Sequence, residues 1–208
     1  MSCRAAFIWQ TKQHFNRYIE DCGITCELVT PHMLAAPFYR GSFNCLIIPT
    51  GFANPSYSNL LPALRSAAFR IERFVKNGGN LLVFGAAADK PDAYDWLPFP
   101  IMYRHDCRPR RIECTPDADC GTIIDDYDPT SIECDGSFPS HEGDCRGTAE
   151  SADVILEKRV GDGRIIVTCV HEFPSRKFLK NFCSTGKETV FCSRPGLRDL
   201  PVYPPFFF

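Results

Sequence analysis

The 208-residue sequence lacks several features that would assign it to a broad functional class. No apolar run approaches the ~20 residues that a membrane-spanning helix needs. The first residues, MSCRAAFIWQTKQH, lack the features of a secretory signal peptide. The net charge is −2, so no excess of positive charge favours nucleic acid or an anionic membrane surface. We therefore expect a cytoplasmic protein that binds neither nucleic acid nor membranes.

Motifs for metal or phosphate binding are also scarce. The chain contains twelve cysteines, but none forms a C-x-x-C pair. Without a secretory signal, thiols or metal ligands are expected rather than a disulfide framework. Cys107, Cys114 and Cys120 come closest to ligand spacing and could bind zinc or an iron–sulfur cluster if loops brought them together. The alternative is that they act as small core hydrophobes, and no cofactor is predicted.

The first half of the chain alternates apolar runs with amphipathic segments. The sequence predicts strands over residues 5–9, 24–29, 43–49 and 80–84, helices over 12–22 and 59–76, and a short helix or turn over 32–36. The run at 43–49, FNCLIIP, is continuously apolar, as in a strand covered on both faces. This alternation predicts an α/β, three-layer sandwich with a flavodoxin-like, mainly parallel sheet of about five to seven strands.

The second half has a different pattern. Residues 91–100 are rich in turn-forming and aromatic residues, and residues 107–135 are acidic and are expected to form a loop. A hairpin is predicted over 154–170 around the Gly/Asp turn, and a final helix is predicted over 175–182.

The last residues differ from the rest of the chain. Residues 183–208 contain few helix or strand signals and end in PVYPPFFF. We therefore predict one domain over residues 1–182, a length sufficient to bury a core, and a disordered tail over 183–208.

Three segments resemble, in order, the motifs of class I glutamine amidotransferase-like domains. Residues 46–52, LIIPTGF, resemble the strand that ends in Pro-Gly-Gly. Residues 74–89, FVKNGGNLLVFGAAAD, resemble the Gly-Gly turn, strand and nucleophile elbow. Residues 161–175, GDGRIIVTCVHEFPS, resemble the late strand that supplies a His and its acidic partner. The match is closer to the divergent branch of biotin-ligase N-terminal-type and trehalose-utilisation-type domains than to true glutaminases.

The resemblance also shows where this chain departs from an active triad. The nucleophile position falls on Gly85 or Ala87, depending on which glycine is aligned, and neither side chain can attack a carbonyl. His171 matches the triad His, but Glu172 comes one place before the family's acid and would point the other way on an extended strand. We therefore expect a pseudoenzyme that has lost thiol-dependent glutamine hydrolysis, in which His171 and Glu172 supply hydrogen bonds or charge.

The resemblance places a binding site at the carboxyl ends of the strands. Gly51 and Phe52 match half of the family's oxyanion hole. The amides of Gly51, Gly85 and Ala86 are expected to form an anion-binding nest. The predicted partner is a small-molecule ligand or another protein, and a homodimer is allowed.

Two other functions remain open at this level. A relocated nucleophile, Cys134, could act with His141 or His171 as an amide or ester hydrolase or an amidotransferase. The alternative there is an acidic turn at Asp135-Gly136, with Cys134 packed and His141 exposed as a surface ligand contact at most. Finally, residues 105–145 could form a Cys-ligated metal or redox protein.

Overall fold

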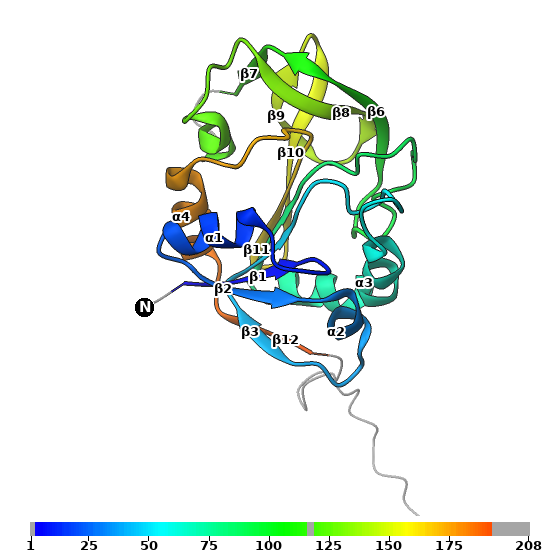
Figure 1. Ribbon diagram of the computed structural model, residues 1–208, viewed down its shortest axis with the longest axis vertical. Coiled ribbons are helices and arrows are strands. Elements are labelled where there is room, and N and C mark those ends of the chain that lie inside the picture. Colours follow the sequence, from blue (N-terminus) through cyan, green and yellow to red (C-terminus); the bar gives the residue numbers. More distant parts are fainter. Residues whose placement is uncertain (1–2, 116–118, 193–208) are drawn as a thin grey trace, which may run out of the picture.

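The computed structural model describes residues 3–115 and 119–192, and its largest element is an eight-stranded sheet (Figure 1). The strands, in the order in which they lie in the sheet, are β2 (Thr25–Val29), β1 (Arg4–Ile8), β4 (Cys45–Ile48), β5 (Asn80–Val83), β11 (Gly163–Thr168), β10 (Ala152–Val160), β9 (Asp144–Ala149) and β7 (Ile112–Cys114). Neighbours from β2 to β11 run parallel, and β10, β9 and β7 continue the sheet antiparallel. The predicted α/β class and flavodoxin-like sheet are therefore confirmed, with more strands than expected.

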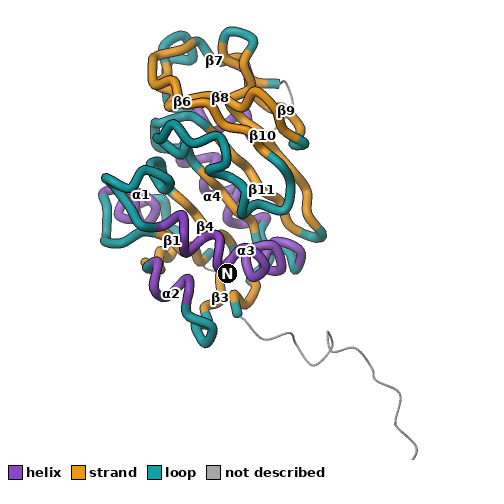
Figure 2. The backbone as a smooth tube through the Cα atoms, turned by 90° about the vertical axis from the view of Figure 1, so that its right-hand side faces the viewer, coloured by secondary structure: helices purple, strands orange, loops and turns teal. Residues whose placement is uncertain are grey.

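Helices cover the parallel part of the sheet. They are α1 (His14–Asp21), α2 (Pro31–Ala35), α3 (Leu60–Lys76) and α4 (Arg176–Thr185). The Arg176 guanidinium lies 5.4 Å from the centre of the Tyr18 ring, which joins α4 to α1. Arg70 of α3 donates to the carbonyl oxygen of Ala36, at 2.9 Å, which joins α3 to α2. Right-handed crossovers place these two pairs on opposite faces of the sheet, and β4, β5 and β11 are buried along their whole length (Figure 2).

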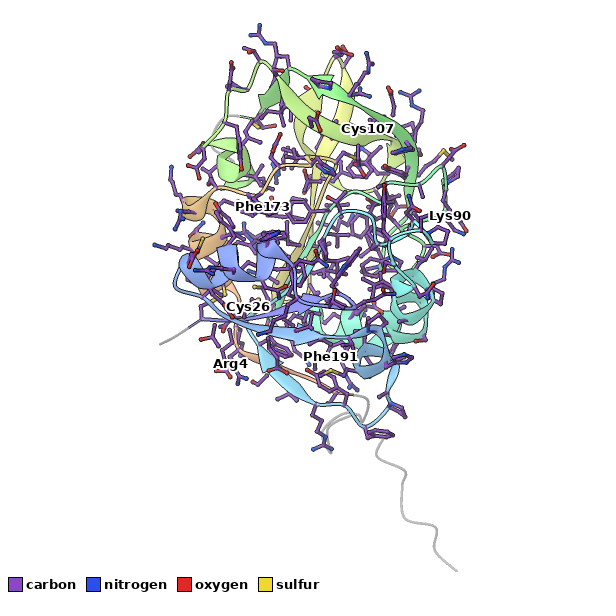
Figure 3. All side chains as sticks on the ribbon, viewed as in Figure 1. Arg4, Cys26, Lys90, Cys107, Phe173 and Phe191 are labelled. Atoms are coloured by element: carbon purple, nitrogen blue, oxygen red, sulfur yellow. A yellow bond between two sulfur atoms is a disulfide. The ribbon has the colours of Figure 1, made fainter. Side chains whose placement is uncertain are left out.

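The turn between α3 and β5 shows why the predicted Asn-Gly-Gly stop works. Gly78 has a φ of 105°, which an L side chain rarely adopts. A Cβ on Gly79 would lie 2.2 Å from the Phe74 ring, so the chain can turn into β5 only with glycine there. Side chains fill the space between the layers (Figure 3). No helix in the described part of the chain is long and apolar enough to cross a membrane.

The prediction of an acidic loop over 107–135 was wrong for most of that segment. β6 (Ile101–Arg110) and β8 (Ile132–His141) form a two-stranded antiparallel sheet, and η1 (Asp119–Ile124) is a short 3-10 helix. The strands were not recognisable because exposed polar residues and Pro109 interrupt the apolar pattern of β6. The predicted hairpin over 154–170 is confirmed as β10 and β11.

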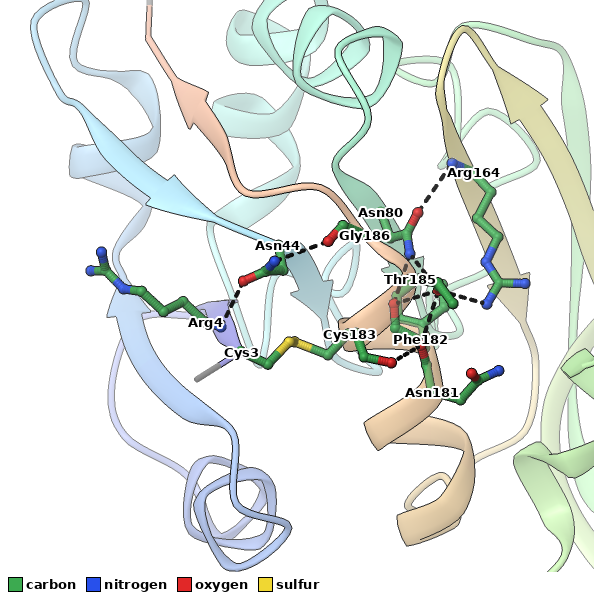
Figure 4. The surroundings of a disulfide bond; sticks show 11 residues. Cys3, Arg4, Asn44, Asn80, Arg164, Asn181, Phe182, Cys183, Thr185 and Gly186 are labelled. Atoms are coloured by element: carbon green, nitrogen blue, oxygen red, sulfur yellow. Dashed lines mark hydrogen bonds between the residues drawn. A yellow bond between two sulfur atoms is a disulfide. The ribbon is translucent and has the colours of Figure 1, made fainter. Parts of the chain in front are cut away.

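The domain extends past residue 182, where the sequence predicted its end. β12 (Thr189–Phe191) pairs antiparallel with β3 (Gly41–Phe43). Cys183, in the last turn of α4, forms a disulfide with Cys3, so the expectation of thiols or metal ligands alone was also wrong (Figure 4). Residues 183–192 therefore belong to the fold, and the rest of the predicted tail, 193–208, lies outside the described residues.

Candidate functional site

A cleft of about 340 Å³ opens at the carboxyl ends of β1, β4, β5 and β11. The residues after each of these strands line it, and the first turn of α1 closes one side: Trp9, Gln13–Phe15, Pro49–Gly51, Phe84, Ala87 and His171–Phe173. Ligands of open α/β sheets bind at this edge, because the loops there diverge around the strand ends. The structure thus brings together three of the segments that the resemblance singled out.

The corner after β5 has a strained residue at its tip. Ala87 has a φ of 47°, in the left-handed region that costs an L residue about 1–2 kcal/mol. Two hydrogen bonds hold it: the Asn54 side-chain amide donates to the Ala87 carbonyl oxygen at 2.9 Å, and the Ala87 amide donates to Asp135 Oδ2 at 2.9 Å. Of the two alignments, the one that places the nucleophile position at Ala87 puts that residue in the cleft, whereas Gly85 is buried beneath it. Turns rather than a helix follow the corner, so no helix N-terminus faces it.

Asp135, which the sequence placed in an exposed acidic turn, is a buried carboxylate of β8 beneath this corner. Its side chain accepts hydrogen bonds from the Ala87 amide and from the Tyr103 hydroxyl, each at Oδ2, while Oδ1 has no hydrogen-bond partner among the described residues. Burial raises the pKa of Asp135 to about 6, against the lowering effect of these donors. A Cβ on Gly85 would lie 1.8 Å from the carboxylate, so only glycine fits at position 85.

The amides expected to form an anion-binding nest already have partners in the protein. The Gly51 amide donates to the carbonyl oxygen of Gly85 at 2.8 Å. The Ala86 amide bonds the Tyr94 hydroxyl. The Phe52 side chain is fully buried, and its ring lies 5.3 Å from that of Tyr94. Gly51 alone of this set lines the cleft, and its amide does not face a ligand.

His171 and Glu172 both line the cleft, and β8 supplies their neighbours. Residues 133–135 pair antiparallel with residues 169–171, with the His171 amide donating to the Glu133 carbonyl oxygen at 2.8 Å. Side chains alternate along paired strands, so this register puts Asp135 on the same face as His171. The acid nearest to His171 in the paired segments therefore comes from β8 and not from the position that the family motif uses.

The segment that carries His171 and Glu172 is fastened to α1. The Phe173 ring stacks on Phe15, with ring centres 4.7 Å apart, and on Tyr18, with ring centres 5.2 Å apart (Figure 3). The Tyr18 hydroxyl donates to the Pro174 carbonyl oxygen at 3.0 Å. These contacts fix where the cleft's polar side chains lie.

The structure contradicts the pairing of Cys134 with His141. They stand at opposite parts of β8, seven residues and roughly 23 Å apart along an extended strand. Cys134 is fully buried, and burial raises the pKa of its thiol to about 12. Because it is bridged to Val170, it faces away from His171. His141 bonds Asp153 Oδ2 at 2.7 Å, outside the cleft, so it is no ligand contact there.

The metal candidates are not gathered into one site. Cys107 is exposed on β6, Cys114 is half-buried on β7, and Cys120 is buried in η1. Within residues 3–115 and 119–192, no group of three His, Cys, Asp or Glu side chains could hold a metal ion.

Sequence reasoning missed part of the cleft and the residue beneath it. Trp9, Gln13 and His14 follow β1 and could have been found from the rule that ligands bind at strand ends. Tyr57, over the Gly51 backbone, and buried Asp135 carried no such signal, because each depends on a tertiary contact.

The sheet order, the crossovers and the strand-end cleft define an α/β protein with a glutamine amidotransferase-like fold. The crystal structure of a putative GMP synthase glutamine-amidotransferase component from Thermoplasma acidophilum is similar to it, with a TM-score of 0.62 at 11% identity over 89% of this chain and 94% of that chain.

Two further solved structures share the fold. A β-galactosidase from Bacillus circulans sp. alkalophilus is similar at a TM-score of 0.55 and 12% identity, over 88% of this chain and 30% of that chain. A cytoplasmic protein from Salmonella typhimurium LT2 gives a TM-score of 0.50 at 13% identity, over 88% and 96% of the two chains. No family model matches the sequence, and no curated protein matches it. These identities show the fold alone.

Proposed function

We propose that this chain is a glutamine amidotransferase-like domain that has lost glutamine hydrolysis and binds a small molecule in the strand-end cleft. The observation that carries the proposal is Ala87, a residue without a reactive group, held in a strained turn in the cleft that His171 and Glu172 also line. Strained backbone persists where the surrounding structure fixes it, and such positions cluster at functional sites. The divergent branch with biotin-ligase N-terminal-type domains is the finer assignment we favour.

The loss of hydrolysis follows from the chemistry of the cleft. Attack on an amide carbonyl needs a nucleophile within about 3 Å of a base. No cysteine lines the cleft within the described residues. Buried Cys134 and Cys169 both have thiols whose pKa is raised by burial, which disfavours the nucleophilic thiolate.

Binding of a small molecule, rather than a protein, follows from the shape of the site. The cavity of about 340 Å³ lies within the range of small-molecule pockets, which combine apolar walls with a few polar groups. Here the polar side chains are those of Gln13, His14, Thr50, His171 and Glu172. Replacing His171 or Glu172 should therefore weaken binding without changing the fold, because both lie at least partly in solvent.

The test combines an activity assay with a binding assay. Glutamine hydrolysis should be undetectable, and alkylation with iodoacetamide should not change this. Glutamine, adenine and galactose represent three chemical classes of probe for ligand-observed NMR. At least one should bind, and His171→Ala should weaken its binding at least fivefold, whereas His32→Ala, an exposed His on α2, should not. Thiol-dependent glutamine turnover, or no binding by any probe, would overturn the proposal.

The proposal needs no metal or redox cofactor, and metal analysis checks this directly. Protein purified under anaerobic conditions should contain less than stoichiometric zinc and iron. One bound metal ion per chain that is lost in a Cys107→Ser, Cys114→Ser, Cys120→Ser variant would instead support the metal-protein hypothesis.

A further inference from the structure

Aromatic rings form most of the cleft's apolar surface. Phe7, Phe15 and Phe84 form its buried base, where Phe15 meets the other two edge-to-face at 5.6 and 5.5 Å between ring centres. Trp9 is nearly buried beside them. Edge-to-face contacts satisfy these rings with one another, so they form a rigid base rather than a mobile one.

Two further rings stand at the rim and are open to solvent. Tyr57 is 63% exposed and Phe173 is 37% exposed. They follow β4 and β11, which are separated by one strand, β5, and so leave the sheet about 10 Å apart. A flat ring in van der Waals contact with a ring on each side needs about 7–8 Å between those rings. The rim can therefore enclose one flat molecule and no thicker one.

Polar groups without partners lie at the same place. Among the described residues, the side chains of His14, His171 and Glu172 make no hydrogen bond or ion pair, although each lines the cleft. Two imidazoles and a carboxylate can both donate and accept hydrogen bonds in one plane. Such a set suits the edge of a ring that carries both donors and acceptors.

We propose that the cleft takes a flat heteroaromatic molecule of one or two fused rings, with hydrogen-bonding groups on its edge. The inference rests on the proposed binding function and names its ligand class. The rings of Tyr57 and Phe173 stack on the ligand faces, and His14, His171 and Glu172 bind its edge. The cavity of about 340 Å³ is near the lower end of ligand pockets, which limits the ligand to this size.

Other ligand classes fit the same observations less well. An organic cation would suit aromatic faces and Glu172, but two imidazoles at the same rim supply no attraction for it. A sugar needs hydrogen bonds around its whole ring, whereas the polar groups here gather near α1 and the end of β11.

The test compares probes of these classes by ligand-observed NMR titration of the full chain. The probes are adenine and nicotinamide, choline, galactose, and glutamine. Adenine or nicotinamide should bind at least tenfold more tightly than the other three. Phe173→Leu and Tyr57→Leu should each weaken that binding about fivefold or more, since base stacking on one aromatic ring is worth this much. Phe173→Tyr should retain it, and Phe38→Leu, at a ring that is 83% exposed elsewhere, should leave it unchanged.

The outcomes separate the ligand class from the binding function. Tighter binding of choline, galactose or glutamine, weakened by His171→Ala, would overturn the heteroaromatic class and leave the cleft as a binding site. Unchanged affinity for adenine and nicotinamide in both Leu variants, with circular dichroism showing an intact fold, would also overturn it. Binding of no probe would overturn both proposals.

Discussion

Replacing Ala87 by Cys tests whether the corner after β5 presents its tip to the cleft. The change adds one sulfur atom to a half-buried Cβ and leaves the backbone chemistry of position 87 unaltered. The left-handed conformation costs Cys about as much as Ala, roughly 1–2 kcal/mol in both, so stability should change little. Any new reactivity therefore reports the location of the side chain.

The size of the effect follows from thiol ionisation. A half-exposed thiol with an ordinary pKa of about 8.5 is about 10% thiolate near pH 7.5. Burial raises the pKa of Cys134 to about 12. Such a thiol is ionised in only about one molecule in 30,000 at the same pH, so Ala87→Cys should be alkylated about 3,000-fold faster.

The assay is peptide mapping by mass spectrometry after timed treatment with iodoacetamide. A Cys107→Ser background removes the exposed native thiol. Ala86→Cys is the matched control, because Ala86 is fully buried one residue earlier and its Cys should stay unmodified. Alkylation of Ala87→Cys as slow as that of Cys134 would refute the placement of residue 87 in an open cleft.

Three further predictions concern the buried carboxylate and the disulfide. Gly85→Ala should lower the free energy of unfolding by about 1–3 kcal/mol, because its Cβ would overlap Asp135, and Asp135→Gly in the same chain should recover at least half of the loss in urea denaturation; additive losses would contradict the contact. Burial raises the pKa of Asp135 from 3.8 to about 6, so the native state binds this proton more tightly than the unfolded chain. The stability of the wild type relative to Asp135→Asn should therefore be highest below about pH 4 and fall by about 3 kcal/mol as the pH rises to 6 and above, and a pH-independent difference would show that the carboxyl is not buried in this way. Replacing Cys3 and Cys183 by Ser removes a cross-link between residues 180 apart and should lower stability by about 2–5 kcal/mol, with dithiothreitol having the same effect on the wild type and none on the variant; equal thermal midpoints with and without reductant would argue against the bond.

The parallel half of the fold was predictable because local patterns determine it. Continuous apolar runs such as residues 43–49, helix stops such as Gly78-Gly79, and the spacing of α3 each encode one element without reference to a partner. The order of those elements then leaves few allowed topologies.

The antiparallel half was not predictable in the same way. β6 and β8 are long, but their identity as strands depends on pairing with each other across more than twenty intervening residues. Cys183 likewise joined the domain through a partner at the other end of the chain. Such pairings leave no periodic signal in either segment alone.

The candidate site divides along the same line. Ala87, His171 and Glu172 were found from short motifs at strand ends, and all three line the cleft. Asp135 was read as part of a turn because its partner, the Ala87 amide, is 48 residues away. Burial of a carboxylate is decided by what packs around it, which the sequence near Asp135-Gly136 does not encode.

The central claim is that the strand-end cleft binds a small molecule and performs no glutamine chemistry. A ¹⁵N-HSQC titration of the full chain with adenine, nicotinamide and glutamine tests it most directly. The account predicts saturable shifts of the amides of Thr50, Gly51, Ala87 and residues 171–173, with no conversion of glutamine to glutamate in the same tube. Shifts confined to other surfaces, or the appearance of glutamate at a rate abolished by iodoacetamide, would contradict it.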